Sequence, residues 1–269
     1  MIRLSDKDRT LCQEGDELGA TPAANVFHRI VTEPAYKAVS AAIERAIVNG
    51  SLAPGEALPT ELELCERFGV HRSTVREAIR QVEQEGLLQR GEGRRLFVCL
   101  PGVDDLVPRA TRLLMLRQTT FQELWELADT LEPLAARLAA RRHQTQDLAL
   151  LQANLVATRM ERDETALVRL DVEFHALVGR AGHNHALMMA REPIGLLYNP
   201  TLLQIFRRLP QAQARNLRAH EQIVDAVRRR DDDTAVQWTL KHMIDFQRGF
   251  ALAGLDMSTP IAGPIQPET

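Results

Sequence analysis

The sequence lacks the features that mark membrane proteins and secreted proteins. In its 269 residues no apolar run reaches the roughly 18 residues that a membrane-spanning helix needs. The charged start, MIRLSDKDRTLCQEGDE, has no apolar core of the kind found in signal peptides. Cysteine is scarce: Cys12, Cys65 and Cys99 are the only three, and they form no CxxC pair. The sequence therefore predicts a cytoplasmic protein with free thiols and no disulfide framework.

A surplus of positive charge is also missing. The formal net charge is −3, and residues 36–100 contain as many acidic as basic side chains. A role in nucleic-acid binding therefore has to be argued from the positions of individual arginines, because the charge total does not indicate one. With 45% apolar and 26% charged residues, the composition is that of a globular protein, and the length suffices for two domains.

The pattern along the chain predicts two folded blocks. We expect a mobile arm at 1–33, a winged helix-turn-helix at 34–100, a linker at 101–106, a helical domain at 107–252 and a disordered tail at 253–269. The arm and the tail contain glycine and proline and show no sustained apolar period. In the second block apolar residues recur at three- and four-residue spacing, as in amphipathic helices. The predicted fold class is mainly α, with a small β-hairpin wing in the first block and an all-α bundle in the second.

The first block contains the signals of a helix-turn-helix. Thr60 and Glu63 have the spacing of a capping box, which predicts a helix that ends at Gly69. A second helix is predicted at 72–85, after a turn of two residues, and two short helices joined by a tight glycine-containing turn are typical of this motif. Residues 87–98, LLQRGEGRRLFV, then predict two strands around a glycine-bearing turn, which would form the wing.

Arginines recur every four residues along the second of these helices. Recognition helices place their N-terminal side chains against base edges and flanking side chains on phosphates, and arginine commonly reads guanine. A merely solvated helix face would show the same spacing, but the two-helix geometry and the basic wing favour DNA contact. The residues predicted to make it are Arg72, Ser73, Thr74, Arg76 and Arg80 on the helix and Arg94 and Arg95 in the wing.

Residues 36–98 carry a more specific pattern. It consists of Gly50, Leu52, Pro54, Gly55, Leu58-Pro59-Thr60-Glu61, Gly69-Val70, Arg72, Val75-Arg76-Glu77-Ala78, Glu85-Gly86-Leu87 and Phe97-Val98. With it the segment resembles the DNA-binding domain of the GntR family. The resemblance implies DNA contacts from Arg72 and Arg76, with Ser73 and Thr74 beside them, and from the wing around Gly93. It also favours a homodimer on an inverted-repeat operator, since helix-turn-helix proteins read two half-sites with two symmetric units.

Three positions depart from the pattern of that family. Leu62 stands where an arginine is usual, His71 replaces the usual serine or threonine at the start of the recognition helix, and Arg95 replaces the second wing glycine. Histidine is a weaker N-cap than serine or threonine. These differences leave the operator sequence open.

The second block contains four residues with metal-binding chemistry. Asp171 and His175 are four residues apart and share a helix face, while His220 and His242 belong to two later helices. One oxygen and three imidazole ligands suit Zn²⁺, Ni²⁺ or Mn²⁺, and helical bundles build such sites from facing helices. Taken singly, each of these histidines is more often a core or surface residue than a ligand.

Three stretches of the second block match a known sensor domain. They are ELWELADTLEPLAARLAA, LDVEFHALVGRAGHNHAL and HEQIVDAVRRRDDDTAV. Residues 121–246 thereby resemble the FCD ligand-binding domain of the FadR branch of GntR regulators. The resemblance implies a divalent metal ion held by Asp171, His175, His220 and His242, with an open side for a small carboxylate effector.

One departure concerns how that effector is held. Many FCD domains carry an arginine just after Glu-Leu in their first helix, where it grips the carboxylate, but here Glu126-Leu127 precedes Ala128 and Asp129. Either the effector lacks the usual carboxylate, or another arginine takes this role. The candidates are Arg137, Arg191, Arg207 and Arg208.

Taken together, these patterns predict a DNA-binding transcriptional regulator without catalytic residues. A small-molecule effector, bound in the metal-containing helical domain, would control its affinity for a double-stranded operator. One alternative is a metal-responsive regulator in which the ion itself is the signal. A metal-dependent hydrolase is less favoured, because no acid–base motif such as HExxH accompanies the ligands. Purely structural histidines are a third possibility.

Overall fold

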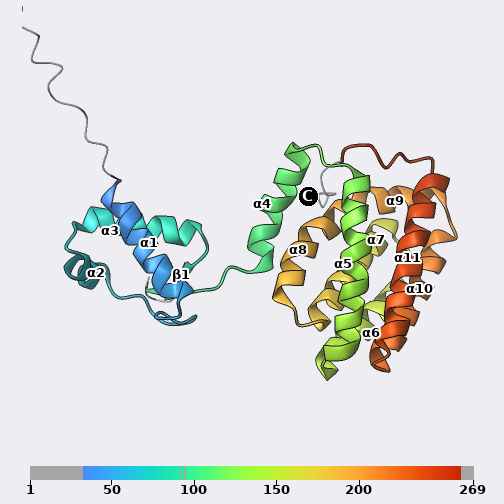
Figure 1. Ribbon diagram of the computed structural model, residues 1–269, viewed down its shortest axis with the longest axis horizontal. Coiled ribbons are helices and arrows are strands. Elements are labelled where there is room, and N and C mark those ends of the chain that lie inside the picture. Colours follow the sequence, from blue (N-terminus) through green and yellow to red (C-terminus); the bar gives the residue numbers. More distant parts are fainter. Residues whose placement is uncertain (1–32, 92, 94, 262–269) are drawn as a thin grey trace, which may run out of the picture. The chain divides into compact units, whose positions relative to one another are not determined.

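The computed structural model describes residues 33–261, except residues 92 and 94. The chain divides after Cys99 into two compact units (Figure 1). The elements of the first unit are α1 (Ala35–Val48), α2 (Glu61–Phe68), α3 (Arg72–Gln84), β1 (Leu88–Arg90) and β2 (Leu96–Val98). This is the winged helix-turn-helix that the sequence predicts.

Local chemistry fixes the two helices of the motif. The hydroxyl of Thr60 accepts a hydrogen bond from the backbone N–H of Glu63, and the Glu63 carboxylate accepts one from the backbone N–H of Thr60, so α2 begins with the expected capping box. Gly69 ends α2 with φ of 65°, a left-handed conformation that glycine adopts without steric cost. The side chain of His71 makes no capping hydrogen bond at the start of α3.

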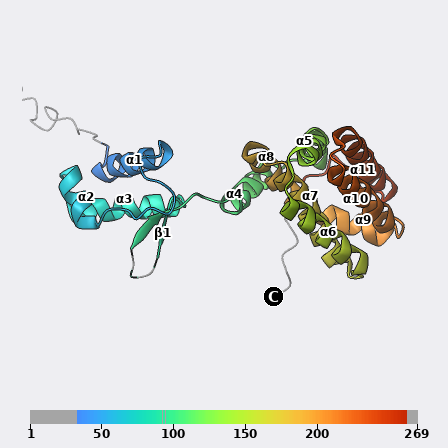
Figure 2. The same ribbon diagram turned by 90° about the horizontal axis from the view of Figure 1, so that it is seen from below.

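The wing is a short antiparallel hairpin. β1 pairs with β2 with Leu88 opposite Val98, and both of these side chains are buried. They join the core that lies between α1 and α3, and the hairpin projects from these helices in Figure 2. The wing is therefore anchored in the same apolar core as the recognition helix.

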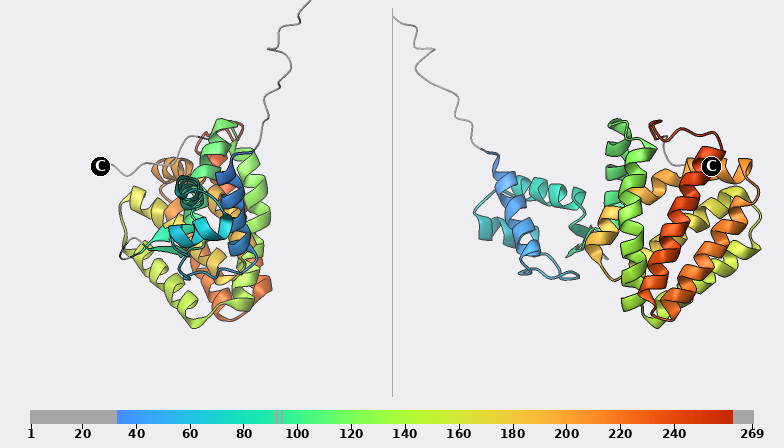
Figure 3. Two further views of the ribbon diagram at one scale, coloured as in Figure 1. Left: turned by 90° about the vertical axis from the view of Figure 1, so that its left-hand side faces the viewer. Right: turned by 45° about the vertical axis from the view of Figure 1, so that its right-hand side comes forward.

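The second unit is an all-α bundle. Its elements are α4 (Val103–Leu116), α5 (Phe121–Arg142), α6 (Thr145–Met160), α7 (Glu164–Ala181), α8 (His185–Gly195), the 3-10 turn η3 (Leu196–Tyr198), α9 (Asn199–Arg208), α10 (Ala212–Arg228) and α11 (Asp232–Leu252). The long helices α5, α10 and α11 lie side by side, with α11 next to both others (Figures 1 and 3). None of the helices in the described part of the chain is long and apolar enough to cross a membrane.

Two predicted segment boundaries are corrected by the structure. The expected linker at 101–106 is shorter, because α4 begins at Val103 after a cap in which the Asp105 carboxylate accepts a hydrogen bond from the backbone N–H of Gly102. The expected disordered tail starts too early. Residues 253–261 pack on the bundle, with Ile261 buried and its N–H donating to the carbonyl of Thr119, because this segment supplies apolar side chains that close the core.

The expected mobile arm at 1–33 lies, apart from its last residue, outside the described residues, and so does the tail from 262 onward. Of the predicted contacts in the wing, Arg94 also lies outside them.

Candidate metal centre and nucleic-acid interface

Three helices bring the four expected ligands together. Asp171 and His175 project from one face of α7, His220 from α10 and His242 from α11, and one ligand atom from each lies within 4.8 Å of all the others. The Nε2 atoms of His175 and His242 are 3.2 Å apart, and Nε2 of His220 is 3.5 Å from Oδ1 of Asp171. Only the folded bundle creates this arrangement, because three helices that are separate in the sequence supply the four residues.

The surroundings of His220 fit a metal ligand. Its side chain is fully buried, its ring stacks on Phe174 at 3.6 Å between centroids, and neither ring nitrogen has a hydrogen-bond partner among the described residues. Burying a nitrogen without a partner destabilises a protein, and such atoms are rare. An ion between the four side chains would satisfy Nε2, so the donor set fits a divalent cation.

The electrostatics keep two of the imidazoles in the form that binds metals. Burial, reinforced by His242 and His175, holds the pKa of His220 well below its usual range. Burial, together with His175, lowers the pKa of His242 to about 3. Both rings are therefore neutral near neutral pH, and a neutral imidazole is the form that ligates.

A buried carboxylate orients the third imidazole. Glu132 on α5 accepts a hydrogen bond from Nδ1 of His175 at 2.9 Å and another from Nε of Arg191 at 2.9 Å. Burial would raise the pKa of Glu132, but Arg191 and His175 outweigh it and lower the pKa to about 2. The same carboxylate outweighs the effect of burial on His175 and raises the pKa of that ring. Since Nδ1 donates to Glu132, Nε2 is turned toward the other ligands, an arrangement common among metal-binding histidines.

The carboxylate ligand is held in a similar way. The side-chain amide of Asn216, on α10, donates a hydrogen bond of 2.7 Å to Oδ1 of Asp171. Burial raises the pKa of Asp171 in spite of the nearby His175 and this hydrogen bond. The structure thus fixes the position of the carboxylate, and a cation among the four side chains would offset the cost of burying its charge.

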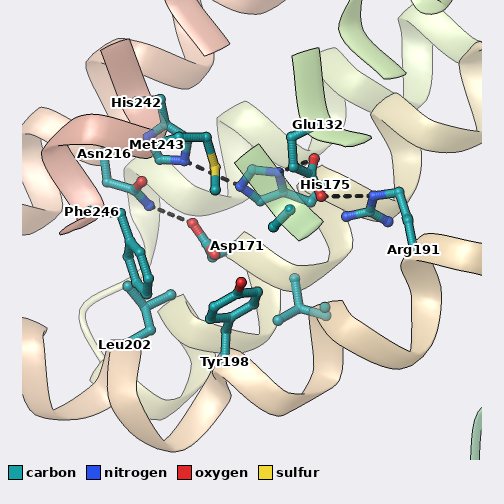
Figure 4. Close-up of a pocket in the computed structure, with 13 residues that line it drawn as sticks. Glu132, Asp171, His175, Arg191, Tyr198, Leu202, Asn216, His242, Met243 and Phe246 are labelled. Atoms are coloured by element: carbon teal, nitrogen blue, oxygen red, sulfur yellow. Dashed lines mark hydrogen bonds and ion pairs between the residues drawn. The ribbon is translucent and has the colours of Figure 1, made fainter. Parts of the chain in front are cut away.

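A small pocket of about 50 Å³ adjoins these four residues. Asp171, His175 and His242 form one side of it, and Tyr198 and Phe246 lie opposite in Figure 4. The hydroxyl of Tyr198 is buried without a hydrogen-bond partner in the described part of the chain, and burial raises its pKa well above the usual range, so it stays protonated.

The four arginines that are candidates for binding the effector carboxylate lie in different environments. Arg191 lines the pocket and is bound to Glu132. Arg137 and Arg207 are not among the lining residues: Arg137 is half-buried in α5, and Arg207 forms an exposed ion pair with Glu164 at 3.2 Å. Arg208 donates to the backbone carbonyl of Ala253.

In the first unit, α3 presents its basic side chains to solvent. Arg72, Arg76 and Arg80 are exposed, and Ser73 and Thr74 share the first turn with Arg72. The opposite face of the helix is buried in the core through Val75, Ala78, Ile79 and Val82. The three arginines are thus available for contact without being needed for packing.

A single carboxylate restrains two of these arginines. Glu61 on α2 contacts Nε of Arg72 at 2.7 Å and lies 3.9 Å from Nε of Arg76. Arg72 also lines a broad groove that Gly93 and Arg95 of the wing share. The helix and the wing therefore border one basic concave surface.

Each of the two units matches a known family of domains. Residues 35–98 match the family described as "Bacterial regulatory proteins, gntR family", and residues 123–245 match the FCD domain. The chain belongs to the GntR family. It therefore combines a DNA-binding helix-turn-helix with an FCD domain, and the proteins that it resembles are regulators of transcription rather than enzymes.

Individual GntR-family proteins are similar to it over most of their length. The Glc operon transcriptional activator of Escherichia coli K12 is 29% identical over 73% of this chain and 81% of its own. The galactonate operon transcriptional repressor of the same strain is 27% identical over 73% of this chain and 88% of its own. A solved structure, Streptococcus agalactiae GntR, superposes with a TM-score of 0.55 at 25% identity, covering 79% of this chain and 99% of that one.

Reasoning from sequence missed the groups that surround the four ligands. The sequence predicts no role for Glu132, Asn216 or Tyr198. Glu132 leaves a signal in the sequence, because it is a charged residue on the helix face that also carries the buried residues Ala128, Ala135 and Ala136. Asn216 and Tyr198 leave none, since only tertiary packing brings them near Asp171.

Proposed function

We propose that this GntR-family chain is a transcriptional regulator whose operator affinity is set by a small-molecule effector bound beside a divalent ion. Asp171, His175, His220 and His242 would hold the ion, which is Zn²⁺, Ni²⁺ or Mn²⁺ by its ligand set. The observation that carries the proposal is the convergence of these four side chains beside a pocket, with neither His220 nitrogen hydrogen-bonded within the described part of the chain.

The bound ion would supply a positive centre with an open side for an anionic group of the effector. The chain supplies the rest: Glu132 orients His175, Asn216 orients Asp171, and most of the pocket wall is apolar. Arg191 extends this network from Glu132 to α8, and α8 packs against α4, the helix that follows the DNA-binding unit in the chain. A shift of α8 on effector binding would therefore reach α4, which couples the two sites.

DNA would be read by the start of α3 and by the wing. We assign base contacts to Arg72 and Arg76, supporting contacts to Ser73, Thr74 and Arg80, and backbone contacts to Gly93, Arg94 and Arg95. One of the similar proteins is named an activator and another a repressor. The similarity therefore favours neither activation nor repression for this chain.

We expect the effector to change operator affinity only when the ion is present. The experiment uses an operator fragment selected from random DNA with the full chain, labelled and titrated by fluorescence anisotropy at fixed salt. With metal-loaded protein, one member of a panel of small carboxylates should shift the dissociation constant by about tenfold or more, which is within the usual range of coupling. Chelated protein should show no shift.

The outcome separates the proposal from its nearest alternative. If removal of the ion alone changes operator affinity and no organic compound has any effect, the ion is itself the signal, and the chain is a metal-responsive regulator. If neither the ion nor any compound matters, control by this pocket is disproved, and only the DNA-binding role remains.

We further expect a homodimer. Light scattering at micromolar concentration should give twice the chain mass of 30.2 kDa, and titration of an inverted repeat should saturate at two chains per operator. A chain that stays monomeric and binds one half-site as tightly as the full repeat would contradict this expectation.

A further inference from the structure

One wall of the pocket carries a buried hydroxyl that makes no hydrogen bond within the described part of the chain. Tyr198 ends η3, and its ring packs edge-on against Phe246 at 5.4 Å between centroids. In Figure 4 its hydroxyl points into the pocket, on the side where Asp171 lies. This hydroxyl is buried and finds no hydrogen-bond partner among the described residues. A buried hydroxyl without a partner is unfavourable, and a bound ligand with a suitably placed oxygen would remove that cost.

Most of the remaining lining is apolar. The carbon-rich residues are Ala128, Val172, Leu202, Met243 and Phe246. The cavity is small, about 50 Å³, so it suits a molecule of only a few carbon atoms. Its apolar lining also offers few hydrogen-bond partners to a ligand that carries many hydroxyl groups.

The charges on the lining limit the charge of the ligand. Glu132 and Asp171 are acidic, and Arg191 is the one basic side chain among the described lining residues. Nε of Arg191 already donates to Glu132, and its Nη1 lies 3.4 Å from the carboxylate of Glu192. A divalent ion would bring the lining to a single positive charge. One carboxylate of the ligand neutralises that positive charge. A second carboxylate would find no free cation in the lining, because Arg191 is already paired with acidic side chains.

Resting on the proposed function, we propose that the pocket binds a small monocarboxylate with one further oxygen, and that Tyr198 hydrogen-bonds to this oxygen. The carboxylate faces the ion, the second oxygen faces the Tyr198 hydroxyl, and the carbon chain lies against the apolar wall. Tyr198 is therefore a residue that selects the ligand, and dicarboxylates are disfavoured.

Calorimetry on the full chain tests this assignment. The protein is reconstituted with Zn²⁺, its zinc content is measured, and five acids are titrated: butanoate, its 2-, 3- and 4-hydroxy derivatives, and butanedioate. In the parent, at least one hydroxybutanoate should bind about tenfold tighter than butanoate, as expected for one added hydrogen bond, and butanedioate should bind more weakly than that acid. Tyr198→Phe should abolish the advantage of the hydroxyl and leave the affinity for butanoate unchanged.

The other tyrosine of the chain provides the matched control. Tyr36 lies in the DNA-binding unit, so Tyr36→Phe should leave all five affinities as in the parent. If butanedioate binds tightest, or if Tyr198→Phe keeps the preference for the hydroxy acid, this inference is overturned while the ion and its ligands stand. If the parent holds no zinc, the inference falls together with the proposed function. If it holds zinc but binds none of the five acids, only this inference is overturned.

Discussion

Replacing His220 with alanine will remove the divalent ion and lower the melting temperature of the helical unit by about 10 °C when metal is supplied in excess. The parent would gain stability because the proposed ion would bind only the folded arrangement of the four residues, and this gain would be about 4 kcal/mol at a thousandfold excess over the dissociation constant. For a unit of this size each kcal/mol shifts the midpoint by about 2–4 °C. Elemental analysis and differential scanning calorimetry, on protein without a histidine tag, measure both effects.

The variant also loses the ring that stacks on Phe174, so the control has to separate packing from metal binding. Melting temperatures of parent and variant are therefore compared after chelation, where the remaining difference is due to packing alone. Asp171→Asn serves as a second variant, because asparagine keeps the shape of the side chain and can still accept the hydrogen bond from Asn216. It should fold like the parent but hold less metal.

A parent that contains no stoichiometric ion after reconstitution at neutral pH would refute the metal centre. If the parent holds the ion and His220→Ala keeps both the ion and the full response to effector, only the assignment of His220 fails. In either case the family and its DNA-binding role would stand, since they rest on other residues.

The sequence predicts the four candidate metal-binding residues better than the side chains that surround them. Asp171 and His175 share a face because they are four residues apart on one helix, which follows from helical geometry alone. His220 and His242 follow from the resemblance to the FCD domain, and the structure places both beside α7. Glu132 contacts His175 across 43 positions of sequence, so only the packing of α5 on α7 reveals it.

The same limit explains the errors at the segment boundaries. The tail was expected to be disordered because glycine and proline interrupt any apolar period, yet Ile261 is buried against the bundle. Isolated apolar residues without a period can fill the edge of a core, and no local pattern shows this. The linker is shorter than predicted for a different reason. A single hydrogen bond between Asp105 and Gly102 caps the start of α4, and one such contact leaves no repeating pattern in the sequence.

The first block was easier to predict, since its signals are local. The capping box at Thr60, the glycine that ends α2 and the strand pattern of the wing each act within a few residues. What the sequence does not show is that Glu61 binds the side chain of Arg72, since the two lie on different helices. This contact bears on how the DNA-binding surface should be tested.

Alanine at Arg72 or Arg76 will weaken operator binding by about tenfold or more in each half-site, which is the effect expected of an arginine that contacts a base edge. In a symmetric dimer each substitution occurs twice, so the loss on an inverted repeat should reach about a hundredfold. The fold should survive, because both side chains are exposed and the buried face of α3 is unchanged. Anisotropy titration at fixed salt measures the loss, and circular dichroism checks the fold.

The control variants follow from the neighbours of these arginines. Arg45→Ala removes an exposed positive charge from α1, outside the proposed surface, and should leave operator affinity near that of the parent.

Removing Arg72 leaves the carboxylate of Glu61 without its nearest partner and close to the proposed DNA surface, where it would repel phosphates. Glu61→Gln combined with Arg72→Ala separates the two effects: a loss that persists in the double variant belongs to the arginine. Binding like the parent by both arginine variants would show that α3 does not read the operator.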